Sequence, residues 1–197
     1  MPLALDRSSL ERTFLDAHTT HTFTDQPVDE ATLRALVDLC RWGPTSMNCQ
    51  PMRLVFVASA EAKARLKPAL SAGNVDKTMK APVTAIVAMD TRFHEHLPTQ
   101  FPAMATAREM FSGNPTLSAD TAMRNSSLQG AYLIVAARML GLAAGPMSGF
   151  NADALNEAFF PDGRFKVNFL VNLGLAAPGG HHPRGPRLSF DEVASIV

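Results

Sequence analysis

Residues 42–51 have the sequence Trp-Gly-Pro-Thr-Ser-Met-Asn-Cys-Gln-Pro and separate a helical pattern from an apolar run. Upstream, Asp29 is a candidate N-cap, and apolar residues follow at the spacing of one buried helix face: Leu33, Leu36, Val37 and Cys40. Gly43 and Pro44 end this helix. Downstream, residues 54–58 favour a β-strand that is covered on both faces. The small hydrogen-bonding residues between them are typical of a ligand loop, although the same residue types also form simple connections.

The rest of the chain alternates helical patterns with few strands. We expect helices over 8–17 (capping box Ser8 and Glu11), from 59 to an interruption at Pro68, 74–80, 118–140, 151–159 and a terminal helix with the capping box Ser189 and Glu192. Further strands are expected over 83–89 and 169–175. Residues 91–115 mix apolar side chains with breakers, which predicts short helices capping an apolar space. These patterns predict an α+β fold, a three-layer sandwich with a small mixed or antiparallel sheet inside a helical shell, in a single domain, 1–197.

Charge and hydropathy exclude several classes of partner. Eighteen basic residues balance 18 acidic ones, so no long-range field attracts nucleic acid or an anionic membrane surface. No apolar run approaches the roughly 20 residues that span a bilayer. Residues 1–7 lack the basic start and apolar centre of an export signal. We therefore expect a cytoplasmic protein that contacts neither membrane nor nucleic acid.

Cysteine and histidine patterns give weak chemical signals. Cys40 and Cys49 are too few for a disulfide framework and are not spaced as a redox pair or a zinc clamp. Cys40 is expected to be a small buried apolar residue, and Cys49 borders the loop without a base nearby in sequence. Two histidine pairs are expected on the surface, because neither pattern supplies a third metal ligand: His94 and His96, and His181 and His182.

A second loop sharpens the interpretation. Residues 145–150, Gly-Pro-Met-Ser-Gly-Phe, follow the long helical segment and repeat the small, backbone-exposing chemistry of the first loop. Together the two loops resemble the nitroreductase family of flavin mononucleotide (FMN) enzymes, and the resemblance extends from about His18 to the C-terminal helix. The amino-acid sequences of several segments are most similar to those of the malonic semialdehyde reductase branch. The resemblance implies an intertwined homodimer with shared active sites.

The resemblance places the FMN phosphate near the start of the matched region. The corresponding residues here are His18, Thr19 and His21, whereas the family usually has Arg and Lys. Since histidine ordinarily titrates near pH ~6.5, this site is less positive at neutral pH. Near the C-terminus Arg187 matches an arginine that grips the phosphate, and Arg184 is the alternative.

Other positions are implied to meet the flavin ring. In the family, the loop with Thr45, Ser46 and Asn48 reaches across the dimer to the partner's flavin. Asn74 and Lys77 match the pair at the pyrimidine edge, where a cation stabilises reduced flavin, although spacing alone also fits a surface lysine. Asn125 matches an amide near the ring or ribitol. The loop beside flavin N5 corresponds to Pro146, Met147, Ser148 and Gly149, with Ser148 where better-known members have Glu.

The implied reaction is ping-pong hydride transfer from NADH or NADPH through FMN to a small molecule. The branch implies reduction of malonic semialdehyde to 3-hydroxypropionate in pyrimidine degradation. Basic candidates for the substrate carboxylate are Arg108, Arg124 and Arg138, each of which also fits a helix surface. No G-x-G-x-x-G fingerprint indicates which nicotinamide is used. Two alternatives stay open: a broad nitroaromatic or quinone reductase, and a flavin-binding protein without turnover.

Overall fold

The centre of the fold is a four-stranded sheet in which every neighbouring pair is antiparallel. This computed structural model describes residues 6–197; the residues 1–5 used in the export argument lie outside the described part. The strands are β1 (Met52–Val57), β2 (Val83–Asp90), β3 (Ala143–Met147) and β4 (Phe165–Gly174), in the order β1-β2-β4-β3. The long strands β2 and β4 are central, and the two shorter strands form the edges.

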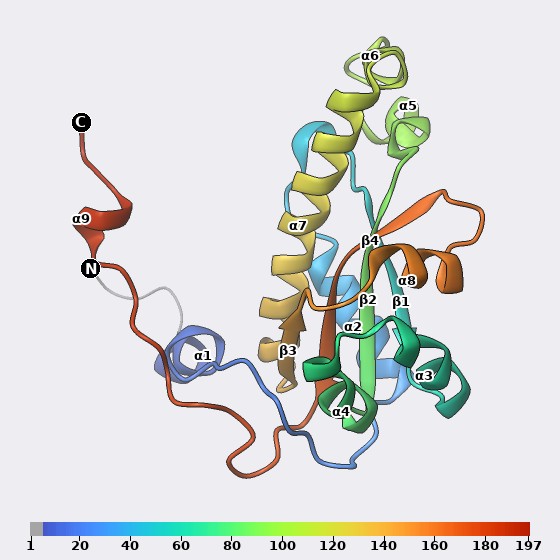
Figure 1. The fold of residues 1–197 in the computed structure, drawn as a ribbon. Coiled ribbons are helices and arrows are strands. Elements are labelled where there is room, and N and C mark those ends of the chain that lie inside the picture. The colour runs from blue at the N-terminus through green and yellow to red at the C-terminus, as the bar shows by residue number, and fades with distance from the viewer. Residues whose placement is uncertain (1–5) are drawn as a thin grey trace.

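Helices cover both faces of the sheet (Figure 1). One apolar core joins α2 (Glu30–Cys40) and α7 (Pro115–Met139) to the sheet, and a second joins α3 (Ala60–Leu66), α4 (Ala72–Lys80) and α8 (Ala152–Phe159) to it. Alternation along β2 separates the cores, because Ala85 and Val87 belong to the first while Ile86 and Ala88 belong to the second. The expected α+β three-layer sandwich is confirmed.

Shorter helices complete the shell. The segment between β2 and α7 folds into a 3₁₀ turn (Phe93–His96), α5 (Leu97–Gln100) and α6 (Ala107–Ser112), as predicted. Their apolar residues pack together with Cys49. At the ends of the described chain are α1 (Arg7–Leu10), which continues as a π-helical turn (Glu11–Leu15), and α9 (Phe190–Val193). Two other 3₁₀ turns cover Ser46–Asn48 and Lys67–Ala69, the latter at the predicted interruption.

Side-chain caps fix several helix starts where the sequence predicts them. Asp29 accepts from the amide of Thr32 at 2.7 Å. Ser59 and Asn151 cap α3 and α8 through the amides of Ala62 and Ala154. The capping box of Ser189 and Glu192 is also present at α9. Gly141 follows α7 with φ of +83°, a conformation that favours glycine.

The structure corrects four local expectations. β3 is not among the expected strands, and residues 145–147 of it fall in the expected second loop, since Ala-Ala-Gly-Pro-Met holds no β-branched or aromatic residue. Asp6, not Ser8, caps α1, because its carboxylate accepts from the amide of Ser9 at 2.9 Å. β1 is half-buried rather than covered on both faces, as an edge strand allows. Val37 is exposed instead of buried.

Two sequence predictions about single residues have mixed outcomes. His96 is exposed as expected, but His94 is half-buried and its Nδ1 atom is enclosed. Cys40 and Cys49 are both buried, and burial raises the pKa of each thiol to about 11. Neither thiol is therefore a reactive thiolate at neutral pH.

Over residues 6–197, no helix combines the length and hydropathy needed to cross a membrane.

Candidate functional site

The candidate site is built on the contact between α4 and the segment that follows β3. The side-chain amide of Asn74 donates to the backbone oxygen of Gly149 at 2.7 Å, and the backbone amide of Ser71 donates to the same oxygen at 3.0 Å. A Cβ atom at position 149 would lie 2.4 Å from Nδ2 of Asn74. Glycine at this position therefore allows the hydrogen bond to Asn74, and the contact joins the two predicted site segments directly.

Lys77 lies three residues beyond Asn74 on α4 and borders a cleft of about 430 Å³. His21 and His182 line the same cleft, together with Thr22, Gly73, Asp76 and Lys80. Burial, followed by the positive charges of Lys77 and His182, lowers the pKa of His21. His21 is consequently neutral at pH 7, and Lys77 and Lys80 are the lysines that line this end of the site.

A second, strongly basic pocket adjoins this cleft, since His21 and His182 line both. It has a volume of about 210 Å³ and brings together every residue predicted to hold a phosphate: His18, Thr19, His21, Arg184 and Arg187. Arg138, from the last turn of α7, lines it as well. This donor set of imidazole, hydroxyl and guanidinium groups matches a phosphate dianion.

The histidines of the C-terminal segment belong to this site, which the sequence did not predict. His181 is stacked on His18, with ring centroids 4.2 Å apart. The ring centroids of His182 and His21 are 4.7 Å apart. All of residues 181–187 are exposed, as expected for a surface segment. The available signal was the basic, glycine-rich and proline-rich composition of that segment, which predicted an irregular conformation but not its position.

The two C-terminal arginines have different roles in this arrangement. The Nη2 atom of Arg184 donates to the carbonyl oxygens of Leu15 and, at 3.0 Å, Ala17, at the end of the N-terminal helix. Figure 1 shows the corresponding chain path, in which the C-terminal segment passes α1 on the α7 side of the molecule. Arg187 donates to carbonyls within its own loop, Gly185 and Pro186. Arg184 thus anchors the segment, while Arg187 is the better candidate to bind an anion.

Of the three arginines considered for a substrate carboxylate, Arg138 is half-buried and points into the basic pocket. Its Nη1 atom donates to the carbonyl of Thr13 at 3.1 Å. Burial, with a smaller effect from Arg184, lowers its pKa, but an arginine stays charged at neutral pH. Arg108 and Arg124 are exposed on α6 and α7 and line none of the clefts described above.

The other predicted site residues lie elsewhere in the chain. The amide of Ser46 donates to Oδ1 of Asn125 at 2.8 Å, and Nδ2 of Asn125 donates to the carbonyl of Thr121 at 2.8 Å. Asn125 is buried, so its amide is used to hold the loop. It lies about 20 Å along α7 from Arg138, at about 1.5 Å per residue. Within one chain, Thr45, Ser46, Asn48 and Asn125 therefore do not converge with Lys77 and Arg187.

The loop that contains Thr45 has an unusual backbone. Met47, Asn48 and Gln50 have φ values of 52°, 49° and 41°, in the left-handed region that non-glycine residues rarely adopt. Each such residue costs on the order of 1–3 kcal/mol and persists only where its surroundings hold it. Nδ2 of Asn48 donates to the carbonyl of Gln100 at 3.0 Å, and Thr45 accepts from the amide of Gln50 at 3.2 Å.

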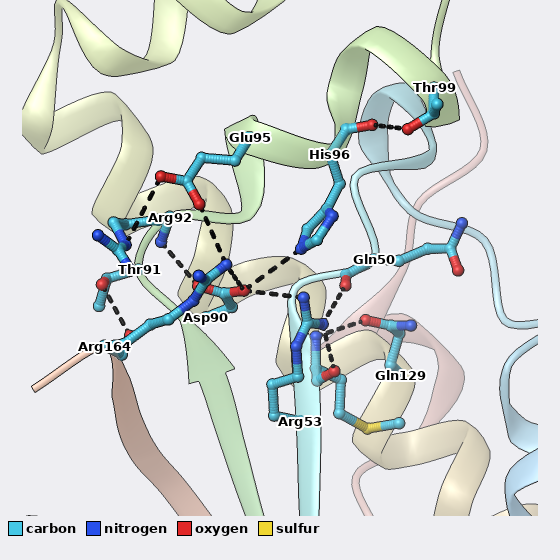
Figure 2. A network of polar contacts seen from close by, with 11 residues as sticks. Gln50, Arg53, Asp90, Thr91, Arg92, Glu95, His96, Thr99, Gln129 and Arg164 are labelled. Atoms are coloured by element: carbon cyan, nitrogen blue, oxygen red, sulfur yellow. Dashed lines mark hydrogen bonds and ion pairs between the residues drawn. The ribbon is translucent and has the colours of Figure 1, made fainter. Parts of the chain in front are cut away.

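A buried ion network supports the end of this loop (Figure 2). Asp90 is fully buried and pairs with Arg53 at 2.8 Å and Arg164 at 3.0 Å. Burial alone would raise the pKa of Asp90, but the hydrogen bond from Arg164 and the neighbouring positive charges lower it overall. Arg53 also donates to the carbonyl of Gln50 at 3.0 Å, so the network connects the sheet to the left-handed loop.

The segment predicted to lie beside flavin N5 is only partly a loop. Pro146 and Met147 are in β3, and the side chain of Met147 is buried in the second core. Its position in the core directs the sulfur toward Thr78, whose hydroxyl lies at 3.4 Å. Ser148 is exposed and Gly149 half-buried beyond the strand end. Ser148 and Gly149 are therefore the residues of this segment that remain available to a ligand.

Comparison with known proteins decides the family. The model of the nitroreductase family matches residues 16–175. This chain belongs to the nitroreductase family. An inferred NADH dehydrogenase/NAD(P)H nitroreductase of Burkholderia lata is 58% identical over 192 residues, which are 98% of each chain. A protein of the same inferred function from Stenotrophomonas maltophilia strain K279a is 55% identical over the full length of both chains. Membership confirms the expected enzyme class, an oxidoreductase of this family.

Solved structures agree on the fold. An inferred nitroreductase of Bacillus subtilis has a TM-score of 0.85 at 19% identity and covers 98% of this chain and 100% of its own. An inferred nitroreductase of Exiguobacterium sibiricum, in complex with FMN, has a TM-score of 0.84 at 20% identity. The match covers 100% of this chain and 99% of the other. At these identities the likeness establishes the nitroreductase fold, in accord with the sandwich described above.

Proposed function

We propose that this nitroreductase-family chain is an FMN-dependent NAD(P)H oxidoreductase that reduces a small aldehyde acid in the cytoplasm. The substrate that we name is malonic semialdehyde, reduced to 3-hydroxypropionate in pyrimidine degradation. The observation that carries the proposal is the continuity of two clefts: the basic pocket around Arg187 adjoins the cleft of Lys77 through His21 and His182. This arrangement fits an elongated ligand whose anionic tail lies in the basic pocket and whose electron-accepting ring lies in the cleft of Lys77.

The residues present fit FMN on their chemistry. The basic pocket supplies charged and neutral donors for a phosphate. Gly149 lets the end of β3 approach Asn74 of α4 closely, which joins the two segments proposed to meet the ring. Bound FMN would supply the chemistry of hydride transfer between NAD(P)H and the second substrate, in a ping-pong reaction. Lys77, which borders the adjoining cleft, would supply an ammonium group to stabilise the negative charge of a reduced ring. Better-known members have Glu at the position of Ser148. The smaller, uncharged serine side chain leaves more space there and carries no negative charge.

The site also requires a second copy of the chain. Thr45, Ser46 and Asn48 lie at the opposite end of α7 from Arg187, so they meet the same ligand only from a partner subunit. The outer faces of α2 and α7, and the turn after α2, expose a set of large apolar residues: Leu39, Trp42, Met123, Leu128, Tyr132 and Met139. A second copy would bury this face. We therefore infer a homodimer in which each full-length domain, 1–197, contributes to two flavin sites.

Absorbance of the purified protein tests the cofactor. We expect a dimer with a flavin band, or stoichiometric uptake of added FMN, and bleaching of that band by NADH or NADPH. A colourless protein that takes up no FMN would refute the proposal. A protein that binds FMN without being bleached would support the alternative of a flavin-binding protein without turnover.

The second candidate function is a broad nitroaromatic or quinone reductase. It is favoured by the inferred NAD(P)H nitroreductase names of the relatives at 55–58% identity. Steady-state turnover of malonic semialdehyde and a nitroaromatic compound, measured side by side, distinguishes the two. We expect a higher kcat/KM for the aldehyde acid, and absence of aldehyde reduction would leave the nitroaromatic activity as the function.

A further inference from the structure

Lys63 of α3 is a buried lysine outside the site described above. It is 5% exposed, and no acidic group is among its hydrogen-bonding partners. Its Nζ atom donates to the carbonyl oxygens of Thr78 and Ala81, both at 2.6 Å, and to Oγ1 of Thr84 at 3.1 Å. An ammonium group has three donors, and these three acceptors use all of them.

Two of these acceptors lie at the C-terminal end of α4. The last carbonyls of a helix lack partners within the helix and carry its partial negative charge. Lys63 satisfies the carbonyls of Thr78 and Ala81 from inside the core, where an unpaired carbonyl would be costly. The lysine thus fixes α4 against α3 and the sheet at one end, while Asn74 and Ser71 fix its other end to Gly149.

The hydrogen bonds continue from Lys63 to β3. Oγ1 of Thr84 donates to Oδ1 of Asn172 at 2.8 Å, and Nδ2 of Asn172 lies 3.3 Å from Oγ1 of Thr78. The hydroxyl of Thr78 then points to the sulfur of Met147 at 3.4 Å. With Lys63 charged, every donor in this chain points away from the ammonium group. All five side chains are buried, so the chain defines one arrangement of α4, the two central strands and β3.

The last two residues of this chain, Thr78 and Met147, adjoin residues of the proposed flavin site. Lys77 directly precedes Thr78 on α4, and Ser148 and Gly149 directly follow Met147. We propose that Lys63 is a positioning residue of the flavin site, which sets Lys77 and Gly149 relative to each other through the buried chain that ends at Met147. This role rests on the proposed FMN function, because it concerns the placement of Lys77 at a flavin ring.

The test compares Lys63→Met with Lys67→Met in the full-length protein. Both variants exchange a lysine for methionine within one turn of each other, but Lys67 is exposed and lies outside the site. We expect Lys63→Met to bind FMN about tenfold more weakly, which corresponds to about 1.4 kcal/mol. We also expect a more negative midpoint potential of the bound flavin, because a displaced Lys77 stabilises the reduced form less. Lys67→Met should match the wild type in both measurements.

A double-mutant cycle with Lys77→Met separates positioning from general stability. If Lys63 acts through Lys77, its replacement shifts the potential in the wild-type background and not in the Lys77→Met background. A Lys63→Met protein that unfolds more easily but keeps the wild-type potential would overturn the proposal. If that variant does not fold, Thr84→Val removes the next hydroxyl of the chain; a shift of the same sign supports the proposal and an unchanged potential overturns it.

Hydrogen exchange on the FMN-free protein gives an outcome that does not depend on the cofactor. We expect faster exchange in residues 72–81 and 147–149 of Lys63→Met, and unchanged exchange in Lys67→Met. Unchanged exchange in both variants would overturn the anchoring by Lys63. A wild-type protein that takes up no FMN would instead overturn the proposed function, which this arm of the experiment distinguishes from a failure of the anchoring.

Discussion

The side-chain amide of Asn74 donates to the backbone oxygen of Gly149 at 2.7 Å, and this contact fixes α4 to the end of β3. The two residues are 75 positions apart in the sequence. Each belongs to a segment predicted to meet a flavin ring, and the hydrogen bond makes the two segments one structural unit. A Cβ atom at 149 would displace the Asn74 amide, so the contact is sensitive to a single methyl group.

Gly149→Ala should weaken FMN binding by about tenfold or more. The new Cβ atom would lie 2.4 Å from Nδ2 of Asn74, which forces the amide away and breaks the hydrogen bond. A lost hydrogen bond of this kind costs about 0.5–1.5 kcal/mol, and the displaced backbone adds to it. Asn74→Ala removes the same bond from the other side. Titration with FMN should show that the double variant loses less than the sum of the single variants; additive losses would contradict the coupling.

His21→Lys should tighten FMN binding at pH 8. Burial, Lys77 and His182 lower the pKa of His21, so the native side chain is neutral there and contributes no charge to the phosphate. A permanent cation in the basic pocket is expected to improve the FMN dissociation constant by roughly tenfold, the equivalent of one charge-assisted hydrogen bond. Thr116→Lys adds the same charge near the start of α7 and serves as the control. Equal effects of both substitutions would show a general field effect instead.

Asp90→Asn should destabilise the protein by about 1–3 kcal/mol, because Arg53 and Arg164 lose a charged hydrogen-bonding partner, while Arg164 keeps its pair with Glu95 at 3.2 Å. The pKa of Asp90 is lowered in the folded protein, so its contribution is present above the unfolded pKa and is lost as the pH falls through the folded one. Urea unfolding at pH 7 measures the loss, with the exposed Asp120→Asn as the control. A change below 1 kcal/mol would contradict the assigned role.

Local chemistry made much of this fold predictable. Asp29, Ser59 and Asn151 cap their helices because each side-chain oxygen meets an amide three residues away, a relationship contained in the sequence itself. β3 was not predictable in this way. Its residues have weak strand propensity, and it forms because β4 offers a free edge on which Pro146 is tolerated.

The site was predictable as chemistry but not as geometry. The family resemblance predicts that His18, His21 and Arg187 bind an anion, and the structure places all three in the lining of one pocket. The stacking of His181 on His18 depends on long-range folding of the C-terminal segment, for which the sequence holds no periodic signal. The hydrogen bond between Asn125 and the backbone of Ser46 joins residues 79 positions apart, a contact that no local pattern in the sequence indicates.

The stability of the protein should rise with pH above pH 8 because of Lys63. Burial lowers its pKa to about 8, whereas lysine in the unfolded chain titrates near ~10.4. Between these values the unfolded state binds more protons, so the free energy of unfolding increases with pH, by at most about 3 kcal/mol. Urea unfolding of wild type and Lys63→Met at pH 7.5 and pH 10 isolates this effect. An identical pH response of the two proteins would contradict it.

Leu128→Glu should convert the dimer to a monomer and abolish FMN binding together. Leu128 is 47% exposed on α7, in the apolar face that also holds Trp42 and Tyr132. A carboxylate buried in such an interface without a partner costs several kcal/mol. If Thr45, Ser46 and Asn48 complete the partner's site, the monomer loses the cofactor even though its own basic pocket is intact. Size-exclusion chromatography with detection of flavin absorbance measures both properties in one experiment. Ala60→Glu, on the opposite layer of the sandwich, should leave both unchanged. A Leu128→Glu monomer that binds FMN as tightly as the wild type would show that each chain holds the cofactor alone.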